Sequence, residues 1–159
     1  MRRLHLSIRI EKPFAGIVGR RFLREVVELT LASAGMNSAV ELGLVIAGDG
    51  TVHELNRSYR SVDRTTDVIS FALTETSDRE VEGFIMPPDD VRHLGDVVIS
   101  YPQAKRQARE HRHPVEHELA LLLAHGVLHL LRYDHQCNHD EKIMKALERK
   151  TIRAWKAKN

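Results

Sequence analysis

The sequence predicts an α+β fold, with one mixed sheet of about four strands and about five helices. The chain has 159 residues, the usual size of one domain. Short apolar segments, with or without a period of two, indicate strands, and longer segments with a helical period lie between and after them. Because no repeat, low-complexity stretch or linker divides the chain, we expect a single domain over residues 1–159.

Four segments are predicted to form the sheet. Residues 4–10 alternate between apolar and mostly polar side chains, which indicates a half-buried strand. Residues 41–47 are short and mostly apolar, which favours an interior strand. Two further strands are expected over residues 67–73 and 94–100.

The helices are predicted from apolar periodicity and from capping residues. Residues 20–34 suit an amphipathic helix. Thr51 and Glu54 have the spacing of a capping box, so we expect a short helix to begin at Thr51, after a turn at residues 48–50. Ser100 is a predicted cap for the next helix. The last three helices are expected over residues 102–112, 114–131 and 138–158.

Residues 74–93 fit neither pattern. They are acidic, contain Pro87 and Pro88, and have no clear period. A structureless loop of this length is uncommon in a compact domain. We therefore expect either a lid over a site or a short strand within this segment.

The composition sets limits on location. The single cysteine, Cys137, excludes an internal disulfide and fits a reducing compartment; we expect it to have a packing role. Residues 1–10 lack the apolar stretch of a signal peptide, and no segment approaches the roughly 20 apolar residues that span a bilayer. We expect a cytoplasmic protein with no membrane partner.

Charge alone does not indicate a nucleic-acid binder. The net charge is +2, from 24 basic and 22 acidic residues. Residues 142–158 are rich in lysine and arginine, with Glu148 as the one acid among them. We interpret this segment as a solvated helix face rather than an RNA contact. With few aromatic residues, any RNA affinity should depend on the phosphate backbone and on salt.

The strongest candidate for chemistry is the segment HGVLHLLRYDH at residues 125–135. His125 and His129 are four apart on a predicted helix, so their side chains share a face and can bind one ion. After a turn, His135 can supply a third nitrogen. Three imidazoles leave a fourth position for water, the pattern of a catalytic zinc ion. We therefore predict one metal ion, Zn²⁺, held on a helix and the turn that follows it; nickel, copper and iron also accept three imidazoles and stay open as alternatives.

The same histidine spacing occurs in the metzincin peptidases, where a glutamate follows the first histidine. Here that position is Gly126, so the general base of a zinc peptidase is missing. The spacing thus supports the metal and argues against peptide hydrolysis. A second histidine group, His111, His113 and His117, is interrupted by Pro114, and we interpret its members as surface side chains.

Three segments together resemble the YbeY endoribonucleases of bacteria. They are residues 125–135, the Leu-Gly-Asp-Val-Val-Ile-Ser stretch at 94–100, and the region that contains Leu55-Asn56, Tyr59-Arg60 and residues 66–71. The likeness covers about residues 45–150. It implies a single YbeY-like domain over 1–159 and a metal-dependent, single-strand-type endoribonuclease. It also implies roles in ribosomal RNA maturation and ribosome quality control, with precursor ribosomal RNA, and ribosomal subunits or proteins, as partners.

The resemblance also implies roles for individual residues. The family's metal-binding histidines fall on His125, His129 and His135, and its functionally important arginine falls on Arg60. We expect this arginine to neutralise charge on the reacting phosphate. Arg132 stands where the family has a glycine that would end the helix with a positive φ. A non-glycine residue in that conformation costs of order 1–2 kcal/mol.

Asp67 and Asp96 are the predicted candidates for hydrogen bonds that orient a metal-binding histidine, and Asp96 matches the family's aspartate. For Asp96, a cap or a structural hydrogen bond is an equal alternative. Two other functions stay open on the sequence. One is a non-catalytic, metal-stabilised ribosome-assembly or RNA-binding factor. The other is a zinc hydrolase acting on small phosphoesters or amides, of which the missing glutamate weakens the amide version.

Overall fold

The computed structural model describes residues 3–62, 64–73, 91–131 and 138–159. The alternatives of a lid or a short strand fall mainly on residues 74–90, outside these ranges. The same holds for Arg132, His135 and Cys137. The predicted turn after the metal-binding helix therefore lies outside the described residues.

Within the described residues, four strands form one mixed sheet, as the sequence predicts, in the order β1-β2-β4-β3. The first three strands of this order are parallel, and β3 runs antiparallel to β4. Strand β2 is interior, as expected, and β4 begins two residues earlier than predicted because the Arg92 backbone N–H donates to the Ala39 carbonyl. The strands are β1 (Leu4–Ile10), β2 (Val40–Ala47), β3 (Val68–Ala72) and β4 (Arg92–Ser100).

Five α-helices lie in the described part of the chain, which confirms the α+β prediction. They are α1 (Arg20–Ser33), α2 (Asp49–Arg60), α4 (Tyr101–Glu110), α5 (Val115–Leu130) and α6 (Asn138–Lys158). A short 3₁₀ helix, η1 (Lys12–Phe14), was not predicted. None of the described helices has the length and apolar composition that a bilayer crossing requires.

The capping prediction is right for α4 and wrong for α2. In α4, the Ser100 hydroxyl accepts a hydrogen bond from the Gln103 backbone N–H at 3.2 Å. Helix α2 begins at Asp49 instead of Thr51. The Thr51 hydroxyl donates to the Glu11 carboxylate at 2.7 Å, and Glu11 also accepts from the Gly48 N–H. A carboxylate from beyond β1 therefore occupies the helix N-terminus, where it interacts favourably with the helix dipole.

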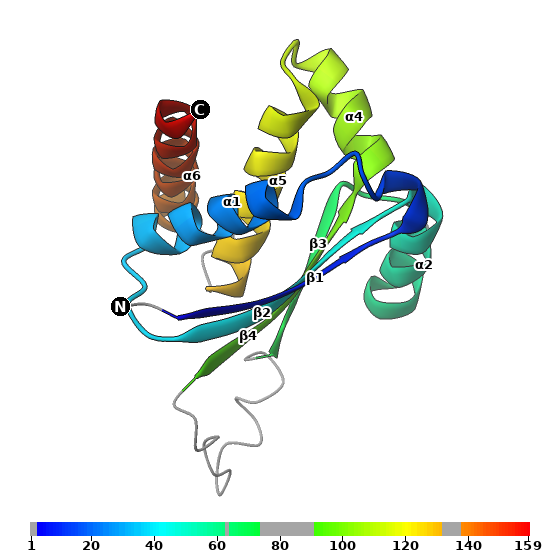
Figure 1. Cartoon of the computed structure of the whole chain (residues 1–159). Coiled ribbons are helices and arrows are strands. Elements are labelled where there is room, and N and C mark those ends of the chain that lie inside the picture. The colour runs from blue at the N-terminus through cyan, green and yellow to red at the C-terminus, as the bar shows by residue number, and fades with distance from the viewer. Residues whose placement is uncertain (1–2, 63, 74–90, 132–137) are drawn as a thin grey trace, which may run out of the picture.

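Helices α1 and α5 pack on one face of the sheet, and α6 packs against these two helices (Figure 1). The main core lies between these helices and the strands, and α5 is apolar on nearly all sides because it is the central helix of this layer. Helix α2 covers part of the opposite face through a smaller cluster that includes Val52, Ile69 and Val98. The candidate histidines are thus carried by the most enclosed helix of the fold.

Candidate functional site

His125 and His129 face each other on α5, as their spacing predicts. Their Nε2 atoms lie 3.1 Å apart, and both side chains are half-buried. Two nitrogen ligands of a tetrahedral zinc ion, each about 2.0 Å from it, are separated by about 3.3 Å. The pair therefore fits a zinc-type ion in both donor chemistry and spacing. The third predicted ligand, His135, lies outside the described residues.

The second ring nitrogen of His125 is held by a carboxylate that the sequence analysis missed. His125 Nδ1 lies 2.6 Å from Oε1 of Glu148 on α6. When the outer nitrogen of a histidine donates to a carboxylate, the tautomer is fixed and the inner nitrogen carries the lone pair that binds metal. The one signal for this role was that Glu148 is the single acid within the basic stretch of residues 142–158.

The packing around Gly126 excludes the glutamate that zinc peptidases have at this position. A Cβ atom at this position would lie 2.7 Å from Cγ1 of Val97, which is closer than real Cβ contacts. The Ser70 hydroxyl also donates to the Gly126 carbonyl at 3.0 Å. Position 126 therefore faces the sheet at close packing distance, and its missing side chain lets α5 lie against β3 and β4.

The histidine pair opens into a polar cavity of about 490 Å³ between α5, β3 and the end of α2. Its walls include two arginines, an aspartate, a serine and an asparagine besides the histidines. These residues are Arg60, Arg64, Asp67, Ser70 and Asn56. Both imidazoles and both guanidinium groups thus border one space, which suits an anionic substrate.

Arg60 lies in this cavity with the histidines. It is the last residue of α2, which ends because Ser61 adopts a left-handed conformation with φ of 57°. Its Nη2 donates to the Ser70 carbonyl at 2.9 Å, and Ser70 in turn bonds to the helix that carries the histidines. The exposed guanidinium is therefore positioned by β3 rather than left to solvent.

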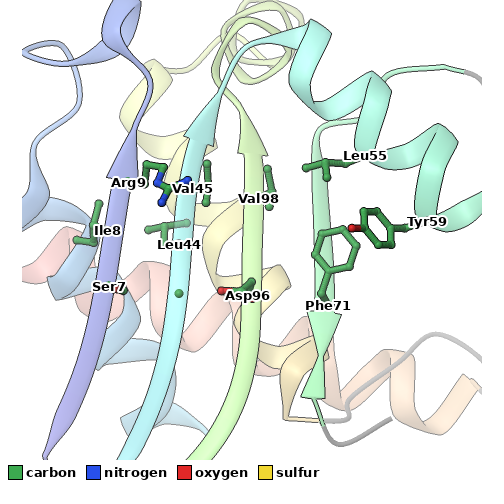
Figure 2. Close-up of a pocket in the computed structure, with 11 residues that line it drawn as sticks. Ser7, Ile8, Arg9, Leu44, Val45, Leu55, Tyr59, Phe71, Asp96 and Val98 are labelled. Carbon is green, nitrogen blue, oxygen red and sulfur yellow. The ribbon is translucent and has the colours of Figure 1, made fainter. Parts of the chain in front are cut away.

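The two aspartates have different positions. Asp67 lines the cavity, but its carboxylate accepts from its neighbour's N–H and from the Gln107 side chain. Asp96 lies on the opposite face of the sheet, beside Gly43, and borders a separate groove with Tyr59 and Phe71 (Figure 2). The prediction that Asp96 orients a metal-binding histidine is wrong, because β4 directs Val97 toward α5 and Asp96 away from it.

The interpretation of the second histidine group as surface side chains is also wrong in part. His111 is exposed, but His113 and His117 are half-buried. His111 and His113 both contact the buried carboxylate of Glu118 on α5. One ligand atom from each of these three residues lies within 4.8 Å of the others, a grouping that could hold a metal ion.

Comparison with known proteins gives a consistent family. The family model described as Endoribonuclease YbeY matches residues 17–156. A protein of that name from Dehalococcoides mccartyi (strain CBDB1) is 43% identical over 148 residues, which span 91% of this chain and 89% of that protein. One from Roseiflexus sp. (strain RS-1) is 41% identical over 150 residues, or 94% and 91% of the two chains.

The fold is also similar to a solved structure. The solution structure of a Thermotoga maritima protein aligns over 96% of this chain and 93% of its own, with a TM-score of 0.56 and 22% sequence identity. At that identity the likeness supports the fold alone. The sequence relatives carry the stronger conclusion and confirm the resemblance read from the three segments: the chain belongs to the YbeY endoribonuclease family.

Proposed function

We propose that this protein is an endoribonuclease that hydrolyses phosphodiester bonds in RNA with one zinc ion held by His125, His129 and His135. The observation that carries the proposal is the facing pair of Nε2 atoms in a cavity that also contains Arg60. The names of the relatives support RNA as the substrate. A bound ion would polarise a phosphoryl oxygen and lower the pKa of a bound water toward about 7.

Glu148 keeps the imidazole of His125 neutral and oriented so that it can bind the ion. Glu148 accepts a hydrogen bond from the Nδ1–H group of His125, and the Nε2 lone pair then faces His129. The two residues come from different helices, so the packing of α6 against α5 sets the ring orientation. The site is therefore preorganised before substrate arrives.

Arg60 has the task of binding the phosphate. One N–H group is used in the bond to the Ser70 carbonyl, and the guanidinium has further donors that can face an anion in the cavity. Its charge does not depend on pH in the physiological range, and its planar fork matches two phosphate oxygens. We infer that it neutralises the negative charge that builds up as the phosphodiester is attacked.

In the cell, we place this activity in ribosomal RNA maturation and ribosome quality control in the cytoplasm. The substrate would be precursor ribosomal RNA, with a ribosomal subunit or ribosomal proteins as further partners. Family membership supports this assignment. The position of Gly126 against Val97 argues against the alternative of an amide hydrolase, because no acid can project from that position into the cavity.

The test is cleavage of a labelled, structured RNA by zinc-loaded protein. His129→Ala is purified and loaded identically, and His5→Ala, on an exposed position of β1, is the matched control. We expect His129→Ala to lose cleavage and His5→Ala to keep it. Equal cleavage by all three proteins, or none by any, would remove the enzyme proposal. RNA binding without cleavage would then favour a metal-stabilised assembly factor.

A further inference from the structure

A second group of metal-binding side chains lies at the other end of α5. The turn between α4 and α5 contains His111, Arg112 and His113, and Arg112 adopts a left-handed conformation with φ of 55°. This conformation reverses the chain, so that the two histidines on either side of Arg112 lie against the first turn of α5. Glu118 projects from that turn, and its side chain is 4% exposed.

The three side chains converge on one point. His111 Nδ1 lies 2.9 Å from Oε1 of Glu118, and His113 Nε2 lies 2.6 Å from the same oxygen. The other carboxylate oxygen accepts a hydrogen bond from Gln107 Nε2 at 3.0 Å. Glu118 is therefore fixed by Gln107 on one side and presents its second oxygen to both imidazoles.

We propose that His111, His113 and Glu118 bind a second divalent metal ion of the zinc type. Two imidazoles and one carboxylate form a donor set that binds zinc and leaves a fourth position for water. Tetrahedral coordination requires about 3.3 Å between ligand atoms, so the rings must move outward by several tenths of an ångström. His111 can do so, because its side chain is 54% exposed and lies in the turn.

The ring of His113 is already oriented for this role. It stacks on His117 with a centroid distance of 4.1 Å and an interplanar angle of 3°. His117 in turn contacts the edge of Trp155 on α6 at a centroid distance of 6.2 Å. This column of rings restricts rotation of His113 and keeps its Nε2 directed at Glu118. The column thus sets the direction of the His113 ring, which must still move outward from Glu118 for a metal ion to fit between them.

The proposed site is distinct from the one that carries the proposed function. Glu118 and His125 are seven residues apart on one helix, which separates them by about 10 Å along the axis. Ions that act together on one phosphate lie about 3.5–4 Å apart. An ion at Glu118 is therefore too distant to share the reaction, and it would instead join the α4–α5 turn to α5 and stabilise it.

The test counts ions in the full-length protein, stripped of metal and then equilibrated with Zn²⁺ by dialysis. We expect two ions in the wild type, one in His113→Ala, one in His129→Ala and none in the double variant. Co²⁺ added to His129→Ala should give the visible absorption of a four-coordinate ion, and His111→Ala should weaken that absorption. Far-UV circular dichroism establishes that each variant folds.

His111→Ala serves as the second variant because its exposed side chain is not part of the core. Equal zinc content in the wild type, His113→Ala and His111→Ala would overturn the proposal. The contacts among His111, His113 and Glu118 would then be hydrogen bonds without a metal ion. Loss of the other ion in His129→Ala without any effect on RNA cleavage would instead contradict the proposed function and leave this site intact. The two failures are therefore distinguishable.

Discussion

The two histidine clusters at the ends of α5 are built on different backbones. His125 and His129 come from consecutive turns of one helix, and their facing nitrogens follow from helical geometry. His111 and His113 lie on either side of a left-handed residue in a turn and meet a side chain of the next helix. The first arrangement depends on local spacing, whereas the second depends on how two helices are joined.

The carboxylates also differ in position. Glu148 contacts the outer nitrogen of His125, and the inner nitrogens face a cavity that contains Arg60. Glu118 lies between its two histidines. Its burial would raise its pKa, but hydrogen bonds from His111, His113 and Gln107 outweigh burial and lower it. The histidine pair His125 and His129 therefore faces a cavity that a substrate can enter. The ligand atoms of His111, His113 and Glu118 instead face one another.

The largest expected effect is a loss of RNA cleavage without a loss of bound zinc. Arg60→Glu should abolish RNA cleavage while both clusters keep their zinc, because in the proposed function the arginine contacts the substrate and not the ions. Loss of one preorganised donor to developing charge typically costs about 100–1,000-fold, and charge reversal costs more. The measurement is cleavage rate beside zinc content, with Arg21→Glu, on an exposed position of α1, as the control. Unchanged cleavage would remove the role of Arg60.

A smaller effect should be confined to the cluster at His125. Glu148→Gln removes the charge that supports His125 Nδ1 and keeps the shape of the side chain. Changes of this kind lower metal affinity by about 10–100-fold. Competition with a chelator measures the zinc affinity. The measurement uses a His113→Ala background, where we expect only one ion to bind. If Glu148→Gln binds zinc as tightly as its parent, the contact serves the packing of α6 and not the metal.

The same contrast explains what the sequence could predict. The period of α5 and the i, i+4 spacing predict the helix and the facing pair, because both are local properties. Glu148 and Glu118 were missed because their partners are set by packing of α6 on α5 and by the left-handed turn at Arg112. The capping box at Thr51 failed for a related reason, since Glu11, 40 residues away in the chain, binds its hydroxyl.

Asp96 is a different kind of error, because the sequence indicates which residues share its face of the sheet but not which face is covered by α5. In a strand, neighbouring side chains point to opposite faces of the sheet. Val97 and Ile99 belong to the core beneath the helices, so Asp96 and Val98 must lie on the other face. Which face meets α5 depends on the topology, and it became clear only from the contact between Val97 and Gly126.

A third prediction concerns Gly126, the glycine that lies between His125 and His129 and faces the sheet. Gly126→Ala places a methyl group 2.7 Å from Cγ1 of Val97 and 3.3 Å from the Ser70 hydroxyl, so α5 must shift from the sheet. Overpacking of this kind costs about 1–3 kcal/mol of unfolding free energy. Urea unfolding measures it, and Gly50→Ala in α2 is the control, because its added methyl would meet no atom within 4 Å. Equal stability of Gly126→Ala and wild type would contradict close packing of α5.

The smallest expected effect is on stability. It concerns the ion pair between Asp49 on α2 and Arg106 on α4, which involves no histidine. Asp49 accepts hydrogen bonds from Ser100 at 2.7 Å and from Arg106 at 2.8 Å. Burial would raise the pKa of Asp49, but these bonds outweigh it and lower the pKa. A carboxylate with a lowered pKa stabilises the fold above its ordinary pKa of about 3.9, and this contribution is lost as the pH falls through the lower, folded value.

Asp49→Asn should therefore cost about 1 kcal/mol at neutral pH, a small value because both partners are partly exposed to solvent. Urea unfolding of both proteins across a pH series should give a constant difference above about pH 5 that shrinks on acidification. A difference that changes between pH 6 and 8 would mean that Asp49 is coupled to the histidines at the far end of α4. The protonation of the His111 cluster would then affect the stability of the contact between α2 and α4.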